Sequence, residues 1–196
     1  MNAADIESLL TTLEGGQVQT IEAGVWQVEM PACRLLAILS DDQSWLRMMV
    51  PIAAASEAEP FCRELLESNF DETGAVRYAL HQEALWAVFQ HALSSLAVED
   101  CAAAIAQLLD LNQRGLKHCF DQYLDRQVSL IILAAKRQNI SLEATLQNLD
   151  RFYQEGVMGD LTAPPEVRTA TLDAWRARLE RLWPVVDVSG TGTVQD

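Results

Sequence analysis

Histidine, cysteine and carboxylate side chains are the groups in this sequence whose types and spacing could support chemistry. His118 and Cys119 are adjacent, and an imidazole beside a thiol is the usual means of activating a cysteine nucleophile. The surrounding residues have helical periodicity, however, and neighbours on a helix point about 100° apart rather than toward each other. The sequence therefore predicts no catalytic residue. An enzyme with a site built from Cys119, His118 or the acidic turns is kept as an alternative hypothesis.

The other histidines and the paired acids do not make a metal or cofactor site. His81 and His91 lie at the two ends of a predicted hairpin, whereas a zinc site needs three or four ligands. The acidic pairs at residues 41–42 and 71–72 fall in turns, where Asp is favoured because it hydrogen-bonds locally. A glycine pair at residues 15–16 lacks the lysine and helix that follow a phosphate-binding loop. We expect no bound metal and no cofactor.

Charge is distributed unevenly along the 196 residues, whose formal net charge is −14. Residues 1–125 contain six Arg and Lys against nineteen Asp and Glu, a net charge of −13, whereas residues 126–184 contain eight against seven. Binding to nucleic acids and to anionic membranes depends on Lys and Arg, so we expect neither as a partner. A helix-turn-helix spacing at residues 134–142 is accordingly interpreted as two packed helices.

Several features favour a soluble protein of the cytoplasm. The longest apolar run, residues 128–135, is far shorter than the ~20 residues that span a bilayer. Asp5 and Glu7 stand where a signal peptide would carry basic residues. Four widely spaced cysteines favour reduced, buried thiols over a disulfide framework. They are Cys33, Cys62, Cys101 and Cys119.

Apolar periodicity predicts a helix and then strands in the first part of the chain. Residues 3–13 have helical spacing, and alternation from Thr20 indicates one half-buried strand. Residues 33–40 and 45–52 are predicted to pair as a hairpin. Proline cannot donate to a ladder, so Pro51 places its strand at a sheet edge or ends it.

A second helix and a second hairpin follow. Residues 57–68 have helical spacing and begin with the capping-box pair Ser56 and Glu59. Residues 76–80 and 85–93 are predicted to pair as a hairpin. Two hairpins and one single strand predict an α+β fold with an antiparallel sheet of about five strands and helices.

Helical spacing continues through the rest of the chain. A long helix begins near Val98 and includes Gly115, which suggests close packing or a bend there. Residues 126–184 are predicted as a helical extension with a linker at 157–165, and residues 185–196 as a flexible tail. The side chains expected to dock the extension on its own domain or on a second copy are Ile131, Leu149, Trp175 and Leu179.

The order of elements, α-β-β-β-α-β-β-α, resembles the type III secretion chaperone-like fold. The resemblance is carried by Phe61–Phe70, with a Leu-Leu-x-x-Asn helix end at Leu65, Leu66 and Asn69, and by the following Arg77–Leu80 and Leu85–Phe89. It covers about residues 3–124, and about 70 further residues follow. It implies a chaperone-like domain at residues 1–125 that dimerises and holds a segment of a partner protein. We therefore expect a homodimer.

Five tryptophans indicate a binding surface. Large aromatic side chains are enriched at interfaces, and a sheet covered by helices on one face leaves residues pointing outward on the other. The candidate partner-binding residues are Trp26, Trp45, Met48 and Trp86. The leading hypothesis is a non-enzymatic chaperone-like or adaptor protein that binds a peptide segment or partner protein through an apolar surface. The alternative is a regulatory or structural interaction protein that uses its C-terminal helices.

Overall fold

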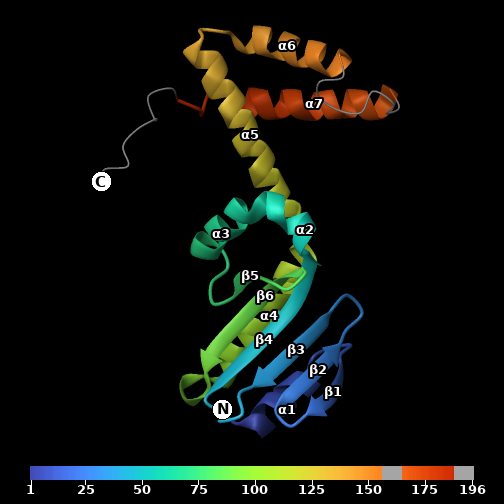
Figure 1. Ribbon diagram of the computed structural model, residues 1–196, viewed down its shortest axis with the longest axis vertical. Helices are drawn as coiled ribbons and strands as arrows, with labels where there is room; N and C mark the ends of the chain where they lie inside the picture. The colour runs from blue at the N-terminus through green and yellow to red at the C-terminus, as the bar shows by residue number, and fades with distance from the viewer. Residues whose placement is uncertain (156–164, 188–196) are drawn as a thin grey trace, which may run out of the picture. The chain divides into compact units, whose positions relative to one another are not determined.

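A computed structural model of the protein describes residues 1–155 and 165–187 (Figure 1). The chain forms two compact units, here called the sheet unit (Met1–Phe120) and the helical unit (Asp121–Asp196). Each unit has a hydrophobic core of its own. None of the described helices is long and apolar enough to cross a lipid bilayer.

The chain begins with helix α1 (Ala3–Thr11), whose start is set by Asn2. The Asp5 backbone N–H donates to Asn2 Oδ1 at 3.0 Å, and the Asn2 N–H donates to Asp5 Oδ2 at 2.9 Å. This reciprocal pair satisfies backbone donors that a helix leaves free at its N-terminus. Ile6 and Leu10 are buried on the same side of the helix, as the predicted amphipathic pattern requires.

The sheet unit is built around a six-stranded antiparallel sheet in the order β1-β2-β3-β4-β6-β5. Its strands are β1 (Gln17–Glu22), β2 (Val25–Glu29), β3 (Arg34–Leu39), β4 (Trp45–Ala54), β5 (Arg77–His81) and β6 (Ala84–Ala92). The predicted α+β class with an antiparallel sheet is confirmed. The strand beyond the expected number of about five is β1. Five of its six side chains are exposed, so it lacks the apolar alternation that marks a half-buried strand.

Strand β4 differs from what Pro51 led us to expect. It lies between β3 and β6 and continues to Ala54, so it is neither an edge strand nor ended by the proline. Its pairing with β3 covers only Leu46–Met49, and its register with β6 shifts between Pro51 and Ala53. The missing N–H of Pro51 therefore falls beyond the β3 ladder and beside an irregularity, where a proline is tolerated.

The helix predicted over residues 57–68 is split by Pro60. Helix α2 (Ala55–Ala58) is followed by a 3-10 turn (Glu59–Phe61) and then by α3 (Cys62–Asp71). The proline ring and its missing N–H interrupt α-helical hydrogen bonding at this point. The predicted capping box is not formed in this described segment, because the residue at the N-cap is Ala54, which has no capping side chain.

Gly115 separates two helices instead of bending one. Helix α4 (Val98–Arg114) ends there, and α5 (Lys117–Arg137) begins two residues later. The glycine has φ +54° and ψ −139°, a conformation that residues with a Cβ atom avoid. A Cβ at this position would meet no described atom within 4 Å. Backbone conformation, not close packing, therefore explains the glycine.

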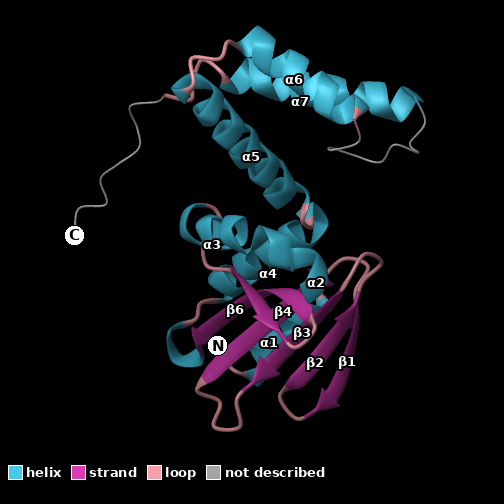
Figure 2. Ribbon diagram, turned by 45° about the horizontal axis from the view of Figure 1, so that its top comes forward, coloured by secondary structure: helices cyan, strands magenta, loops and turns pink. Residues whose placement is uncertain are grey.

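Helices α1 and α4 pack on one face of the sheet and enclose the core (Figure 2). Alternate residues of the strands point into this layer, and α4 adds a stripe at helical spacing. The largest buried side chains of this core include Ile6, Leu10, Trp26, Leu35, Leu46, Met48, Leu85, Ile105 and Leu108.

The edge strand β5 is capped by a side chain of α3. The Tyr78 N–H donates to Asn69 Oδ1 at 2.7 Å, and Asn69 Nδ2 donates to the Tyr78 carbonyl at 3.2 Å. The amide of Asn69 thus takes the place of a neighbouring strand at Tyr78 and protects this edge of the sheet. This contact gives a structural role to the asparagine that ends the Leu-Leu-x-x-Asn segment.

We expect Asn69→Ala to lower the free energy of unfolding of the sheet unit by about 1–3 kcal/mol, because both backbone groups of Tyr78 lose their partner. Urea denaturation followed by circular dichroism measures the change. Gln147→Ala removes an exposed amide from the helical unit and serves as the control, with an effect within about 0.5 kcal/mol. A loss for Asn69→Ala no larger than the control's would contradict the capping role.

The helical unit consists of α5 beyond Asp121, α6 (Leu142–Gln154) and α7 (Pro165–Leu182). Its core is formed by Val128, Ile132, Leu149 and Leu179, with Leu142, Leu146, Trp175, Leu182, Trp183 and Val186 packed around them. Three of the side chains expected to dock the extension, Leu149, Trp175 and Leu179, thus hold its own helices together. Of the predicted linker at 157–165, only Pro165 is among the described residues, and it begins α7. Residues 188–196 of the predicted tail also lie outside the described residues.

Ion pairs join α7 to α5 within the helical unit. Arg178 places Nη2 2.5 Å from Asp121 Oδ1 and Nε 3.0 Å from Asp125 Oδ1. Arg181 Nη2 donates to both carboxylate oxygens of Asp125 at 2.7 Å. Partial burial would raise the pKa of the Asp125 carboxyl, but the bonds and charges of Arg181 and Arg178 outweigh this and hold the pKa below its usual value.

Candidate partner-binding surfaces

The face of the sheet that points away from α1 and α4 carries half-buried apolar side chains, here called the outer sheet face. Strand alternation puts them there, because the residues between them point into the core. Cross-strand pairing brings Leu36 beside Met49, Met49 beside Val88, and Pro51 beside Trp86. The members of the outer sheet face are Val25, Leu36, Ile38, Trp45, Met49, Pro51, Ala79, Trp86 and Val88.

Two indole rings of the outer sheet face are held by polar neighbours. Trp86 Nε1 donates to the His81 carbonyl at 3.3 Å. The Arg47 guanidinium carbon lies 5.0 Å from the centre of the Trp45 ring, and Arg47 Nε and Nη2 both donate to Gln90 Oε1, at 3.0 and 2.7 Å. The polar neighbours orient the rings while both indoles keep solvent-accessible area, as at protein interfaces.

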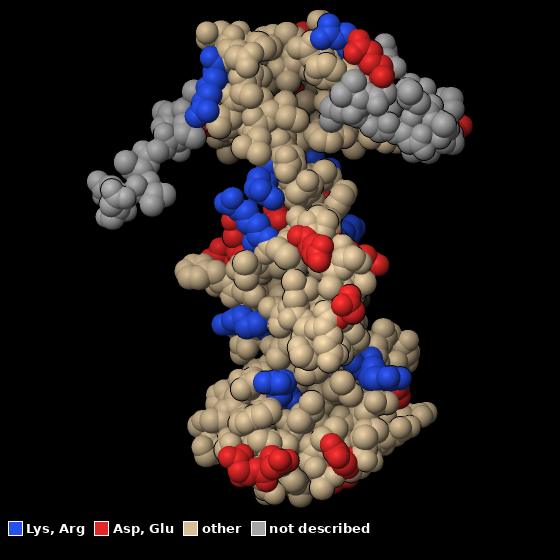
Figure 3. All heavy atoms as spheres, viewed as in Figure 1, with Lys and Arg blue, Asp and Glu red and all other residues tan. Residues whose placement is uncertain are grey.

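A hollow of about 450 Å³ lies beside Trp86 on this face. It is lined by Gln27, Glu29, Met30, Pro31, Ala32, Cys33, Arg34, Leu36, Pro51 and Trp86. Glu29 Oε1 accepts hydrogen bonds from Arg34 Nε at 2.6 Å and from Gln27 Nε2 at 2.8 Å. The negative charge of Glu29 and the positive charge of Arg34 therefore lie side by side in the lining of the hollow. On the face of the molecule drawn in Figure 3, charged side chains of both signs are likewise scattered among uncharged residues. The hollow thus combines apolar walls with the paired charges of Glu29 and Arg34.

The structure divides the four predicted partner-binding residues between the two faces of the sheet. Trp26 and Met48 are 3% and 0% exposed and belong to the core, so they are not available to a partner. Trp45 and Trp86 lie on the outer sheet face. Leu36, Ile38 and Val88 were not among the predicted residues, because they stand in nearly continuous apolar runs whose sequence does not mark which side chains point outward.

The residues considered for catalysis are placed in ordinary structural roles. His118 Nε2 lies 3.0 Å from a carboxylate oxygen of Glu72. Burial and the neighbouring carboxylates raise the pKa of the Cys119 thiol to about 11. At neutral pH this group is protonated, whereas the nucleophilic form of cysteine is the thiolate. His81 of β5 pairs with Ala84 near the start of β6, whereas His91 lies near the end of β6. The seven residues from Ala84 to His91 put the two histidines roughly 23 Å apart along the strand direction.

No group of three or more His, Cys, Asp or Glu side chains in the described ranges is arranged to hold a metal ion.

A second apolar surface is formed by α3 and β5. Leu66, Phe70 and Leu80 are 67%, 91% and 47% exposed. A small hollow of about 140 Å³ lies between the two elements. Acidic residues Glu67 and Asp71 flank Phe70 and Leu66 on the helix. Arg63 Nε lies 2.8 Å from Glu67 Oε1, so the margin of this apolar surface carries charges of both signs.

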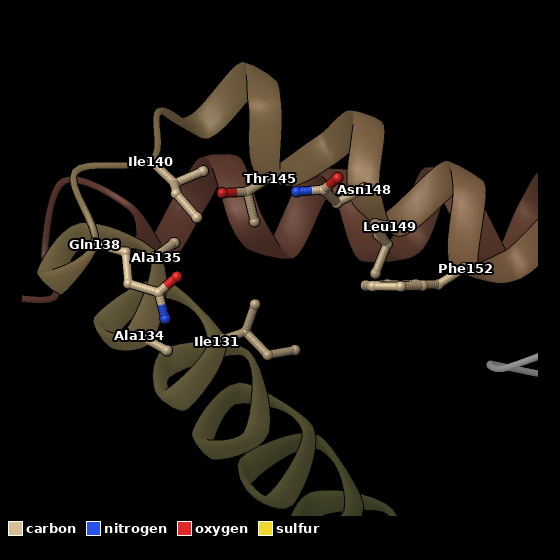
Figure 4. Close-up of a pocket in the computed structure, with 9 residues that line it drawn as sticks. All are labelled: Ile131, Ala134, Ala135, Gln138, Ile140, Thr145, Asn148, Leu149 and Phe152. Atoms are coloured by element: carbon tan, nitrogen blue, oxygen red, sulfur yellow. The ribbon is translucent and has the colours of Figure 1, made fainter.

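A third apolar surface is a groove of about 440 Å³ between α5 and α6 in the helical unit (Figure 4). Figure 4 shows Leu149 and Phe152 pointing from α6 toward Ile131 of α5. The turn between the helices closes one end, near Ala135 and Ile140. The complete lining is Ile131, Ala134, Ala135, Gln138, Ile140, Thr145, Asn148, Leu149 and Phe152.

Comparison with known proteins finds similarity only among solved structures. No protein-family model matches the chain, and no curated protein matches it. A chain of the HopA1–SchA chaperone–effector complex is 12% identical, with a TM-score of 0.45, over 60% of this chain and 98% of that one. The Yersinia pestis type III secretion chaperone SycH, in complex with a fragment of YscM2, matches at 15% identity and TM-score 0.46, over 58% and 98%. A chain of the ExsC–ExsE complex matches at 15% identity and a TM-score of 0.38, over 59% of this chain and 97% of that one.

Proposed function

We propose that the protein is a non-enzymatic, cytoplasmic chaperone-like or adaptor protein that holds a segment of a partner protein on its outer sheet face. The observation that carries the proposal is the run of half-buried apolar side chains between Trp45 and Trp86, with a hollow beside the second indole. Burial of apolar area contributes about 25 cal/mol per Å², and tryptophans dominate many interfaces. The resemblance of residues 3–124 to secretion chaperones supports the same role.

The chemistry of this face favours an apolar segment over a charged one. Glu29 and Arg34 lie in contact at the rim of the hollow, so their charges offset each other. Leu36, Pro51 and Trp86 supply an apolar wall. A partner segment with aliphatic or aromatic side chains at alternate positions would match the two-residue period of the strands.

Trp86→Ala is expected to reduce partner capture roughly 30-fold, because loss of a central hot-spot tryptophan removes about 2 kcal/mol of binding free energy. The measurement is a quantitative pull-down from native cell extract with the full chain as bait, comparing the wild type with the variant. Ile21→Ala, which shortens an exposed apolar side chain of β1, is the control. Equal recovery of the same proteins by the wild type and Trp86→Ala would contradict the proposal.

We also propose that the protein is a homodimer. The resemblance implies dimerisation, and the structure has three apolar surfaces on which a second copy could be seated. Light scattering of the full chain at micromolar concentration should give about twice the 21.8 kDa of one chain.

A further inference from the structure

Three adjacent strands of the sheet are free of acidic residues, although the chain contains 28 Asp and Glu. Strands β4, β6 and β5 carry no Asp or Glu, and their basic residues other than histidine are Arg47 and Arg77. Residues 1–125 as a whole contain nineteen acidic residues against six Arg and Lys. This part of the sheet is therefore positive on a strongly negative domain.

Both arginines belong to the outer sheet face. Arg47 precedes Met49 by two residues on β4, where buried residues alternate with those that point outward. Arg77 is paired with Val88, and paired residues of neighbouring strands point to the same face. Met49, Val88 and Arg77 thus form one row across three strands, and Arg47 lies two residues further along, opposite Gln90. Two strand spacings and two residues put the arginine Cα atoms roughly 12 Å apart, with Val88 between them.

Neither arginine is paired with a carboxylate among the described residues. Arg47 Nε and Nη2 both donate to the amide oxygen of Gln90. Arg77 Nη1 donates to oxygen atoms of residues 73–76. Arg47 Nη1 and the Nε and Nη2 atoms of Arg77 therefore keep N–H groups that no described residue accepts. Both guanidinium groups can bind a further acceptor without giving up these bonds.

We infer that the segment held on the outer sheet face carries carboxylates that pair with Arg47 and Arg77, which rests on the proposed function and specifies its partner. A guanidinium is the side chain best suited to carboxylates, because its planar N–H groups match their two oxygens. In an extended segment, residues i and i+4 lie on the same side and roughly 13 Å apart, close to the separation of the arginines. Residue i+2 lies between them and would cover Met49 and Val88. The expected motif is acidic-x-apolar-x-acidic.

The charged and apolar requirements fall on neighbouring parts of one face. Trp86 lies two residues from Val88 along β6, and in the hollow beside it Glu29 offsets the charge of Arg34. The apolar remainder of the segment would lie there. A net charge of −13 would by itself favour a basic partner, but the three strands that hold this site have no carboxylate to offer one.

Three synthetic peptides with an uncharged N-terminal dye and an amidated C-terminus test the charge requirement. The first is Gly-Glu-Thr-Leu-Thr-Glu-Gly, and the other two have Gln or Lys in place of both Glu residues. Fluorescence anisotropy with the full-length protein measures their dissociation constants. Exposed charge pairs give up to about 5-fold in affinity each, so the Glu peptide is expected to bind about 25-fold more tightly than the Gln peptide. The Lys peptide should bind most weakly, and added salt should narrow the differences.

Arg47→Gln and Arg77→Gln are each expected to weaken binding of the Glu peptide about 5-fold and to leave the Gln peptide within about 2-fold. Arg63→Gln makes the same change at an exposed arginine of α3 and is the matched control, which should bind all three peptides as the wild type does. Thermal melts verify that each variant is folded. Arg47→Gln decides the test if Arg77→Gln is destabilised, because Arg77 also holds residues 73–76.

A preference for the Glu peptide that Arg47→Gln reduces and Arg63→Gln keeps supports the inference. Equal affinity for the Glu and Gln peptides, no binding of any peptide, or a preference that Arg47→Gln retains in full would overturn the acidic motif. An equal loss in Arg63→Gln would show a general charge effect and also overturn it. The pull-down with Trp86→Ala remains independent: reduced capture there leaves the proposed function standing after any of these results. Unreduced capture as well would overturn both.

Discussion

Trp26→Ala is expected to lower the free energy of unfolding of the sheet unit by about 3–5 kcal/mol. The indole is 3% exposed and lies in the core between the sheet and its covering helices. Its removal loses the transfer free energy of a large aromatic group and leaves a cavity that a close-packed interior fills only in part. Urea denaturation followed by far-ultraviolet circular dichroism measures the change without relying on tryptophan fluorescence.

Trp45→Ala makes the same chemical change on the opposite face of the sheet. This indole is only half-buried, so its removal opens no enclosed cavity, and we expect less than half the loss of Trp26→Ala. The pair therefore tests which tryptophan is structural. Equal losses for the two variants would show that the assignment of the faces is wrong.

Leu179→Ala is expected to lower the free energy of unfolding of the helical unit by about 2–5 kcal/mol. Leu179 is 0% exposed and is one of only four buried side chains in the described core of this unit. A small core has few other contacts with which to offset the loss. Hydrogen exchange with mass spectrometry should show faster exchange in α6 and α7 and unchanged protection in β4 and β6, because the sheet unit has a separate core.

Leu133→Ala is the matched control for this prediction. Leu133 is a half-buried leucine of α5 outside the four-residue core, so its truncation should increase exchange much less. Loss of protection in the strands of the Leu179→Ala protein would contradict the independence of the two cores.

Local sequence determined most of the elements, because their signals lie within a few residues of each other. The side chain of Asn2 starts α1 through a bond to Asp5. An apolar run marks β4, the alternation of residues 85–90 marks β6, and the helical period marks α4. Two predicted helices have other boundaries in the structure. Pro60 splits the helix predicted over residues 57–68, and the positive φ of Gly115 ends the long helix that begins at Val98.

Tertiary structure decided which side chains can meet a partner. Trp26 and Trp86 have the same chemistry and both lie in strands of alternating burial, but strand order and the placement of α1 and α4 put one inside and the other outside. The same is true of Pro51, whose tolerance in a central strand depends on where β3 stops pairing. The groove between α5 and α6 arises because residues 131–138 and 145–152, on consecutive helices, come together when the helices pack. Periodicity along the chain specifies which side chains share one face of a helix or strand, whereas only the packing of elements specifies what covers that face.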